Sequence, residues 1–306
     1  MISVFFMLKV AHSPLYAHSL PEGHRFPMEK YSLLPEQLLY EGTLTQENFF
    51  IPDLLEEKWI LNTHDAHYFQ RLKNLELTRS EIRATGFPLS EGLVRREIQI
   101  ASGSVQAAVF ALEHGIGMNI AGGTHHAFTD RGEGFCLLND IAITANFLLE
   151  NQLSNRVLVV DLDVHQGNGT AQIFQHSTDV FTFSMHGAKN YPHRKEKSHL
   201  DISLPDGTAD EEYLDKLNHN LSLVLDKFSP DFIIYQCGVD VLSSDQLGRL
   251  SLSQQGVKLR DDFVLSNARN RQIPIMCCMG GGYSKQIKVI IEAHAHVFRL
   301  AQELYS

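Results

Sequence analysis

The stretch from Arg156 to Thr170 constrains the fold of this 306-residue chain more than any other part of it. Four consecutive apolar residues, Val157 to Val160, predict a strand buried on both faces, which is typical of a parallel sheet covered by helices. The run ends in Asp161-Leu-Asp163-Val-His165. Because side chains alternate along a strand, Asp161, Asp163 and His165 are expected on one side of it. Two carboxylates and an imidazole are costly to bury unless they bind something, and a metal ion is the simplest partner.

Composition narrows the class of protein. The apolar content of 43% is ordinary for a globular chain, and the formal charge of −10 argues against non-specific nucleic-acid binding. The cysteines form no CxxC pair, so we interpret them as buried thiols rather than disulfides or zinc ligands, which suggests a reducing compartment. They are Cys136, Cys237, Cys277 and Cys278.

The start of the chain is apolar from Met1 to Val10, but it has no basic leader and Lys9 interrupts it. A first strand is therefore favoured over a signal peptide. No apolar run reaches the roughly 18 residues that a membrane span needs. We expect a cytoplasmic protein with one domain over residues 1–306.

Apolar spacing predicts alternating helices and strands. The expected helices are Ser90 to His114 with Gly115 as its stop, Asn139 to Glu150, Asp210 to Phe228, Gln254 to Asn270, and Ser284 to Leu304. The other expected strands are Ile116 to Ala121, Asp179 to Met185, Phe232 to Cys237, and Ile273 to Met279. This alternation predicts an α/β fold with a doubly wound, mostly parallel sheet flanked by helices.

Polar side chains follow the carboxyl ends of five predicted strands, at the edge where ligands bind in open α/β sheets. They are His125 and His126, Asp163 and His165, His186, Asp240, and Tyr283. Catalytic zinc takes three protein ligands, and Asp163, His165 and Asp240 would supply them. The tandem histidines add a general base and acid, and Tyr283 a donor to a developing oxyanion.

These motifs resemble those of the histone deacetylase family of the arginase/deacetylase superfamily. The matching segments are GGTHHA (122–127), GEGFCLLND (132–140), DLDVHQGNGT (161–170), CGVD (237–240) and GGGY (280–283). They cover nearly the whole chain in the family's order. Three further segments look most like the class IV branch, namely HSPLY (12–16), DEEYLDKL (210–217) and DQLGRLSLS (245–253).

The resemblance implies roles for individual residues. Asp163, His165 and Asp240 would bind zinc, with Fe(II) as the alternative metal. The resemblance further implies catalytic roles for His125, His126, Tyr283, Asp161 and Asn168, with His126 nearest to the general base and Asp161 bonded to His125. A structural potassium ion would use Asp161, Ser184 and Met185. The acyl-lysine channel would use Gly134, Phe135, Tyr191, Leu247 and Gly281.

Asn168 departs from the class I pattern, in which an aspartate stands opposite the second histidine. An amide orients an imidazole but cannot stabilise its charged form fully. The pKa of His126 should therefore be lower than it would be beside an aspartate, which suits a base.

The resemblance implies a zinc-dependent hydrolase that removes acetyl or longer fatty acyl groups from lysine side chains of proteins. Three alternatives stay open. An acetylpolyamine amidohydrolase would use the same zinc site, but it tends to carry insertions that are not seen here. An arginase-type dimetal enzyme needs more aspartates than CGVD offers. A non-catalytic acyl-lysine binding module would be expected to have lost one of the catalytic residues.

Overall fold

The predicted strand of the 156–170 stretch is β4 (Val157–Asp161), and it is buried on both faces. In this computed structural model, which describes residues 7–306, the side chains of β4 alternate between two apolar clusters. Leu158 and Val160 belong to the larger cluster, and Val157 and Val159 to the smaller one. The period of two in a strand requires this alternation, so a continuous apolar run gives a strand between two helical layers.

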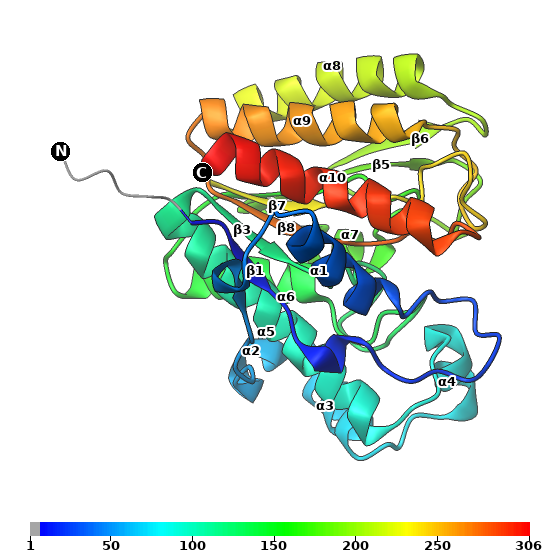
Figure 1. The fold of residues 1–306 in the computed structure, drawn as a ribbon. Helices are drawn as coiled ribbons and strands as arrows, with labels where there is room; N and C mark the ends of the chain where they lie inside the picture. The colour runs from blue at the N-terminus through cyan, green and yellow to red at the C-terminus, as the bar shows by residue number, and fades with distance from the viewer. Residues whose placement is uncertain (1–6) are drawn as a thin grey trace.

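Residues 7–306 form a single α/β domain around an eight-stranded sheet in which every pair of neighbouring strands is parallel. The order is β2-β1-β3-β8-β7-β4-β5-β6 (Figure 1). The other strands are β1 (Lys9–Ala11), β2 (Phe49–Phe50), β3 (Ile116–Asn119), β5 (Val180–Gly187), β6 (Leu200–Leu204), β7 (Phe232–Gln236) and β8 (Ile275–Cys278).

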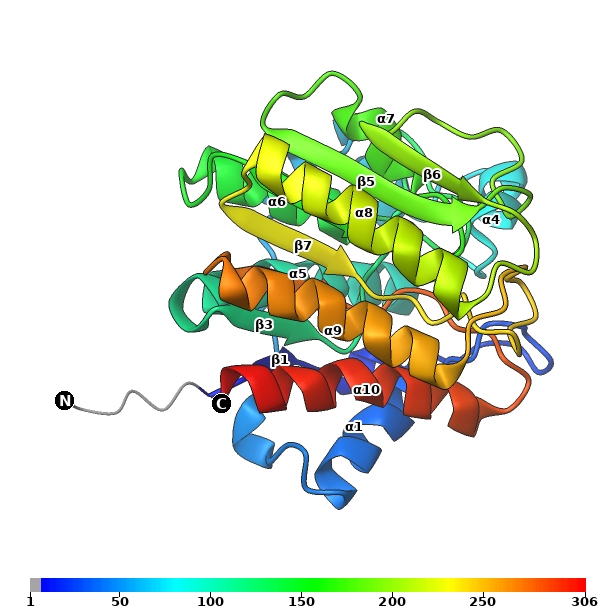
Figure 2. The same cartoon turned by 90° about the horizontal axis from the view of Figure 1, so that it is seen from above.

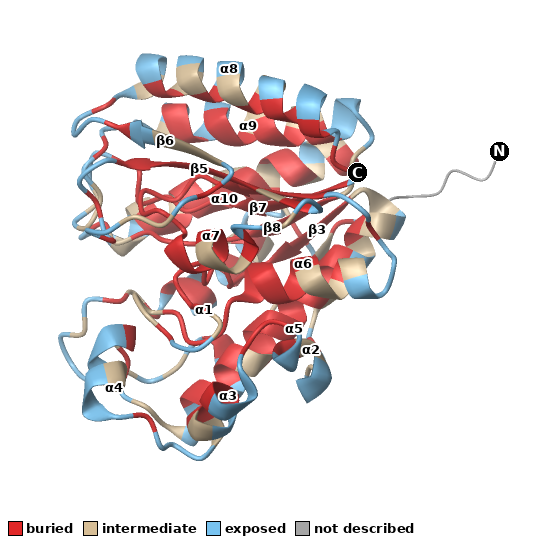
Figure 3. Cartoon of the chain, turned by 180° about the vertical axis from the view of Figure 1, so that it is seen from behind, coloured by how far each residue is buried: buried red, intermediate tan, exposed pale blue. Residues whose placement is uncertain are grey.

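Helices cover both faces of the sheet (Figures 1 and 2). One layer is α8 (Asp210–Phe228), α9 (Gln254–Asn270) and α10 (Ile287–Tyr305); the other includes α5 (Glu91–His114) and α6 (Asp140–Glu150). Shorter helices are α1 (Lys30–Tyr40), α2 (Glu57–Leu61), α3 (Ala66–Lys73), α4 (Arg79–Thr85) and α7 (Asn168–Phe174). Figure 3 shows most of the sheet and the inner sides of the helices buried, whereas the edge strand β6, α4 and the outer side of α8 carry partly or fully exposed residues.

The predicted bounds of α5 are confirmed by its caps. The Ser90 hydroxyl accepts a hydrogen bond from the amide of Leu93, which satisfies one of the free donors of the first turn. Gly115 ends the helix with a φ of 83°, a left-handed conformation that glycine adopts without the strain of a Cβ.

The strand ends lie in one row. Asp161 of β4 is in register with Gln236 of β7 and with Ser184 of β5, and Gln236 is in register with Cys278 of β8. Cys278 in turn pairs with Asn119 of β3. The segments that follow these strands therefore leave the sheet side by side.

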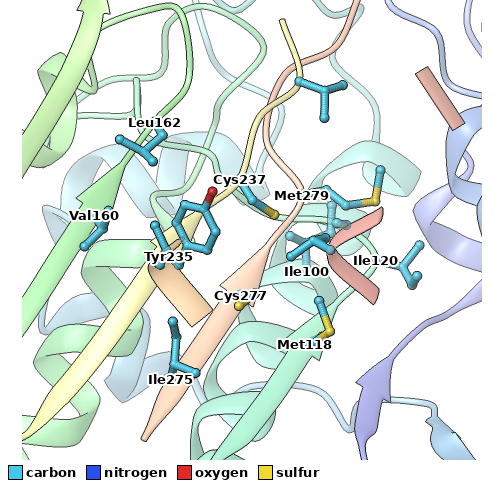
Figure 4. Close-up of a cluster of buried hydrophobic side chains, with 14 of the residues drawn as sticks. Ile100, Met118, Ile120, Val160, Leu162, Tyr235, Cys237, Ile275, Cys277 and Met279 are labelled. Atoms are coloured by element: carbon cyan, nitrogen blue, oxygen red, sulfur yellow. The ribbon is translucent and has the colours of Figure 1, made fainter. Parts of the chain in front are cut away.

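Below the row of strand ends, apolar side chains of the strands pack in one cluster. Figure 4 shows Val160, Tyr235, Cys277 and Met118 in a row across four neighbouring strands, with Ile100 of α5 also in this apolar cluster. All four cysteines are buried, as the sequence predicts. Rigid packing below the row fixes where the polar segments begin.

Some predictions need correction. β5 continues to Gly187, so His186 lies inside a strand rather than after it. β4 ends at Asp161, so strand alternation does not bring Asp163 and His165 together. The loop after β4 brings these two residues together, because the Asp163 amide donates to Asp161 Oδ1 and the His165 amide donates to Asp163 Oδ1.

The predicted first strand lies mostly outside the described residues, and within them β1 begins at Lys9. The sequence analysis does not predict β2, β6, α7 or the helices α1 to α4. None of the helices between residues 7 and 306 combines the length and apolarity that a membrane crossing requires.

Candidate active site

Asp163, His165 and Asp240 converge beyond the ends of β4 and β7, and we call them the metal triad. His165 Nδ1 lies 2.9 Å from Asp163 Oδ1 and 3.1 Å from Asp240 Oδ2. One ligand atom from each residue lies within 4.8 Å of the other two, and all three residues are buried. Two carboxylates and an imidazole form a donor set that suits zinc or a similar divalent ion.

Electrostatics favour a positive charge at this point. Burial lowers the pKa of His165, but hydrogen bonds to the two carboxylates and their charges outweigh burial and raise that pKa to about 10. Burial raises the pKa of Asp240 to about 7, and the nearby charge of Asp163 acts in the same direction. A cation bound between the three side chains would relieve the repulsion between the carboxylates of Asp163 and Asp240.

The outer oxygens of the two carboxylates are held by the protein. Asp163 Oδ2 accepts hydrogen bonds from Gln236 Nε2 at 2.8 Å and from the Gly281 amide at 2.9 Å. Asp240 Oδ1 accepts one from the Val164 amide at 2.9 Å. Such bonds fix the orientation of metal ligands, and they leave Asp163 Oδ1 and Asp240 Oδ2 toward the common point.

Position 281 must be a glycine, because its backbone passes close to the carboxylates of Asp163 and Asp240. A Cβ at Gly281 would lie 2.0 Å from Asp240 Oδ2 and 2.8 Å from Asp163 Oδ2. Only glycine therefore lets the backbone amide reach the carboxylate. Gly281 thus contacts the metal triad, and it also lines a small cavity at the site.

A buried ion pair supports the two segments that carry the metal triad. Arg260 and Asp261 lie 2.8 Å apart and are fully buried on α9. The guanidinium donates to the carbonyls of Leu162 at 3.3 Å, Gly238 at 2.6 Å and Cys237 at 3.3 Å. Arginine suits this task because its fixed fork serves several acceptors at once.

The two tandem histidines have different partners. His125 Nδ1 lies 2.7 Å from Asp161 Oδ2, and both side chains are buried. Burial lowers the pKa of His125, but the charges of Asp161 and Asp163 and the hydrogen bond to Asp161 outweigh it, so that the pKa rises to about 9. His125 therefore holds its proton near neutral pH.

His126 Nδ1 lies 2.6 Å from Asn168 Oδ1. The amide nitrogen of Asn168 faces Glu133 Oε2 at 3.4 Å, which fixes the amide with its oxygen toward the imidazole. His126 Nδ1 therefore carries the hydrogen, and Nε2 is left as an acceptor. Burial and the charges of His125 and His165 hold the pKa of His126 well below its usual value.

Asp140 holds the turn that carries the tandem histidines. Its carboxylate accepts hydrogen bonds from the amide and hydroxyl of Thr124, at 2.8 and 2.6 Å, and from the amide of Gly123 at 3.2 Å. Ser104 of α5 donates to the same carboxylate at 2.5 Å. The turn is thus tied to two helices.

The backbone of Tyr283 is fixed from two directions. Its amide donates to Asp245 Oδ2 at 2.6 Å, and the buried Lys30 donates to the Gly280 carbonyl at 2.9 Å. The Lys30 ammonium also lies 5.8 Å from the centroid of the Tyr283 ring. The ring centroids of Tyr283 and His165 are 6.4 Å apart, so the tyrosine stands beside the metal triad.

Two cavities meet at the site. The outer cavity has a volume of about 480 Å³ and the inner one about 40 Å³. Both are lined by His126, Gly134, Phe135, His165 and Tyr283. Tyr191 and Leu247 line only the outer cavity, and His125 and Gly281 only the inner one.

The predicted potassium site is less clearly assembled. Asp161 and Ser184 are in register on neighbouring strands, and Met185 is buried beside Ser184. The Ser184 hydroxyl, however, lies 2.9 Å from His186 Nδ1, so it already has a protein partner. Cation binding there stays a prediction.

The sequence analysis gives no role to several supporting residues, namely Lys30, Gln236 and Arg260, and Glu133, Asp140 and Asp245, which lie within its motifs. One signal was available for Arg260. Its spacing from Val257 and Val264 on α9 places it on the buried face of that helix. Gln236 likewise ends an apolar run, where an unpaired amide would be costly.

Comparison with known proteins agrees with this geometry. A family model described as the histone deacetylase domain matches residues 24–299. An uncharacterised protein of Picosynechococcus sp. is 42% identical over 97% of this chain and 99% of its own length. Histone deacetylase 2 of Arabidopsis thaliana is 30% identical over 88% of this chain and 72% of its own length. Histone deacetylase 1 of Oryza sativa subsp. japonica is 31% identical over 86% of this chain and 54% of its own length.

Among solved structures, the crystal structure of the HDA15 HD domain matches with a TM-score of 0.79 at 19% identity. The match covers 94% of this chain and 89% of that chain. It supports the fold.

Arg260→Met should lower the free energy of unfolding by about 3–5 kcal/mol, because it leaves the carboxylate of Asp261 buried without a counter-charge. Urea denaturation measures this change. Lys258→Met, at an exposed position of the same helix, should change it by less than about 0.5 kcal/mol. Equal effects of the two substitutions would show that the buried pair does not support the strand ends.

Asp240→Asn should abolish stoichiometric zinc binding while the protein stays folded, because the amide keeps an acceptor for the Val164 amide but loses the ligand charge. Zinc per chain is measured by elemental analysis after dialysis, and folding by circular dichroism. Asp226→Asn, at an exposed site on α8, serves as the matched control. Full zinc retention in Asp240→Asn would remove Asp240 from the ligand set.

Proposed function

The chain belongs to the histone deacetylase family, and we propose that it is a zinc-dependent hydrolase that removes acetyl groups from lysine side chains of proteins. One observation carries the proposal. Asp163 and His165 of the metal triad, the tandem histidines and Tyr283 line the inner cavity, and His126, His165 and Tyr283 also line the outer one.

The donor set supports zinc as the resident metal, with Fe(II) as the alternative. Zinc held by the metal triad would polarise the scissile carbonyl and lower the pKa of an attacking water. The protein contributes the fixed orientation of Asp163 and Asp240, whose outer oxygens are bonded to Gln236, Gly281 and Val164.

The outer cavity would hold the lysine side chain. Phe135 and Tyr191 line it, and the aromatic rings suit the aliphatic stem of lysine. The Tyr191 ring stands edge-on to His126, with centroids 5.0 Å apart. The amide bond would then lie at the junction of the two cavities, and the acyl group in the inner one.

His126 would act as the general base. Its Nδ1 hydrogen is engaged by Asn168, so Nε2 is the atom that accepts a proton from water. His126 also lines the outer cavity, where the lysine amine departs, and His125 does not. His126 is therefore our candidate to return the proton to the amine. Protonated His125 would stabilise negative charge developing beside it.

Tyr283 would donate its hydroxyl to the substrate carbonyl oxygen. Burial holds the pKa of Tyr283 well above its ordinary value, and the charges of Asp163 and Asp240 act in the same direction. The phenol therefore keeps its proton at neutral pH and remains a hydrogen-bond donor.

The volume of the inner cavity favours a short acyl group. About 40 Å³ is room for roughly three water-sized probes. An acetyl group fits this space, whereas a long fatty acyl chain would require the walls to move. Ile100 of α5 is one of these walls and is fully buried.

The finer expectations from the sequence remain part of the proposal. We take residues 1–306 as one catalytic domain with a cytoplasmic location. We assign the chain to the class IV branch because of the three segments 12–16, 210–217 and 245–253. Asp161, Ser184 and Met185 stay the candidate potassium site.

Tyr283→Phe should lower kcat for an acetyl-lysine peptide by roughly 10²–10³-fold, because it removes one donor to the developing oxyanion. Zinc content and peptide affinity should be unchanged. Tyr191→Phe, which removes a hydroxyl from the same cavity, is the control and should have a much smaller effect. Near-normal turnover by Tyr283→Phe would contradict the proposed chemistry at its central step.

The enzyme should have a kcat/KM at least about tenfold higher for an acetyl-lysine peptide than for the same peptide carrying a myristoyl group, because only the former fits the inner cavity. Ile100→Ala should shift the preference toward butyryl- and hexanoyl-lysine. Val105→Ala, a buried position on the same helix outside the cavity wall, should not. Equal activity of the wild type on both peptides would rule out the inner cavity as the limit on acyl length.

A further inference from the structure

The entrance of the outer cavity carries an excess of positive charge. Four of its lining side chains are arginine or lysine and one more is histidine: Arg25, Arg83, Lys189, Arg249 and His193. All five are exposed at the surface. The same cavity is lined by His126, His165 and Tyr283, so the cations surround the opening that leads to the reacting atoms. We call the four arginine and lysine residues the cationic rim.

The cationic rim is only partly neutralised by the protein. Arg249 and Lys189 lie 3.3 and 3.6 Å from a single carboxylate, that of Asp206. Their side chains are still 56% and 73% exposed. Arg25 lies over the Phe135 ring at 5.0 Å, and no carboxylate among residues 7–306 forms a salt bridge with it. The rim can therefore bind further anions.

Negative charge at the entrance is scarce. Of the described residues that line the outer cavity, Glu133 is the one acid. Its carboxylate already accepts hydrogen bonds from Arg131 at 3.0 Å and from the Tyr191 hydroxyl at 2.7 Å. It thus has little capacity left to attract a basic substrate.

This distribution is opposite in sign to the charge of the chain as a whole, whose formal value is −10. An acidic protein with four cations around one opening focuses its positive potential there. We propose that the cationic rim makes the enzyme selective for acyl-lysines that are flanked by acidic residues. This inference rests on the proposed function, and it identifies the class of protein substrate. Segments rich in lysine and arginine, and free acetylpolyamines, would be repelled.

The expected change in peptide affinity follows from the strength of exposed ion pairs. Each pair changes an equilibrium constant by about 1.4- to 5-fold, and salt weakens the effect. Three flanking carboxylates should therefore strengthen binding by about 3- to 100-fold at low ionic strength. The advantage should shrink as salt is added.

The test measures peptide binding separately from turnover. Three fluorescein-labelled peptides share a central acetyl-lysine and differ only in flanking aspartates, serines or lysines. Their dissociation constants are measured by anisotropy with full-length, zinc-loaded Tyr283→Phe protein, which is expected to bind substrate with little turnover. Affinity should fall in the order aspartate, serine, lysine, by about tenfold or more in total. Acetylspermidine should compete poorly.

Reversing the charge of two rim residues tests whether the cationic rim causes this order of affinities. Arg83→Glu combined with Lys189→Glu, in the same background, should abolish or reverse this order. Lys227→Glu combined with Lys258→Glu makes the same change of charge at exposed positions of α8 and α9 that do not line the cavity, and it should leave the order intact. Circular dichroism checks that both double variants are folded.

Turnover of the serine peptide by the wild-type enzyme separates the two claims. If that peptide is deacetylated but the three peptides bind equally, or the lysine peptide binds best, the rim proposal is wrong and the proposed function stands. If no peptide is deacetylated but the aspartate peptide binds best through the rim, the proposed function fails and the claim about substrates fails with it, whereas the preference of the rim for acidic peptides stands.

Discussion

The burial of two carboxylates around one imidazole is the constraint on which the rest of the structure depends. Asp163 and Asp240 are almost completely removed from water, and neither can stay charged there without partners. Amides from the segments after β4 and β8, together with the Gln236 side chain of β7, satisfy their outer oxygens. Arg260 donates hydrogen bonds to carbonyls of the segments after β4 and β7. The ends of three strands are thus tied together, and the inner carboxylate oxygens are left for a cation.

How much of this the sequence predicts depends on how local the signal is. α5 is predictable because its apolar spacing, its Ser90 cap and its Gly115 stop all lie within one segment. β6 has mostly partly exposed residues and α7 is seven residues long, so neither has a strong pattern. The sheet order, with β8 between β3 and β7, depends on packing between distant segments. In the site, polar residues after apolar strands are conspicuous in the sequence. Arg260 is not, because a charged residue in a helix is usually exposed.

The two tandem histidines illustrate how adjacent residues acquire different chemistry. His125 faces a carboxylate and keeps its proton, whereas His126 faces an amide and stays neutral. This separation of pKa values is what an enzyme needs to combine a base with a fixed positive charge. In the proposed function, the cavities add selection at both ends of the substrate. We propose that the small inner cavity limits the acyl group and that the cationic rim of the outer cavity selects the sequence around the lysine.

The central claim is that hydrolysis of acetyl-lysine depends on one divalent ion held by the metal triad. It is tested most directly by adding zinc in small steps to metal-free protein and measuring acetate released from an acetyl-lysine peptide. The account predicts no release without metal, a linear rise with added zinc, and a plateau at one zinc per chain. Full acetate release by the metal-free protein, or none at any level of zinc or Fe(II), would contradict it.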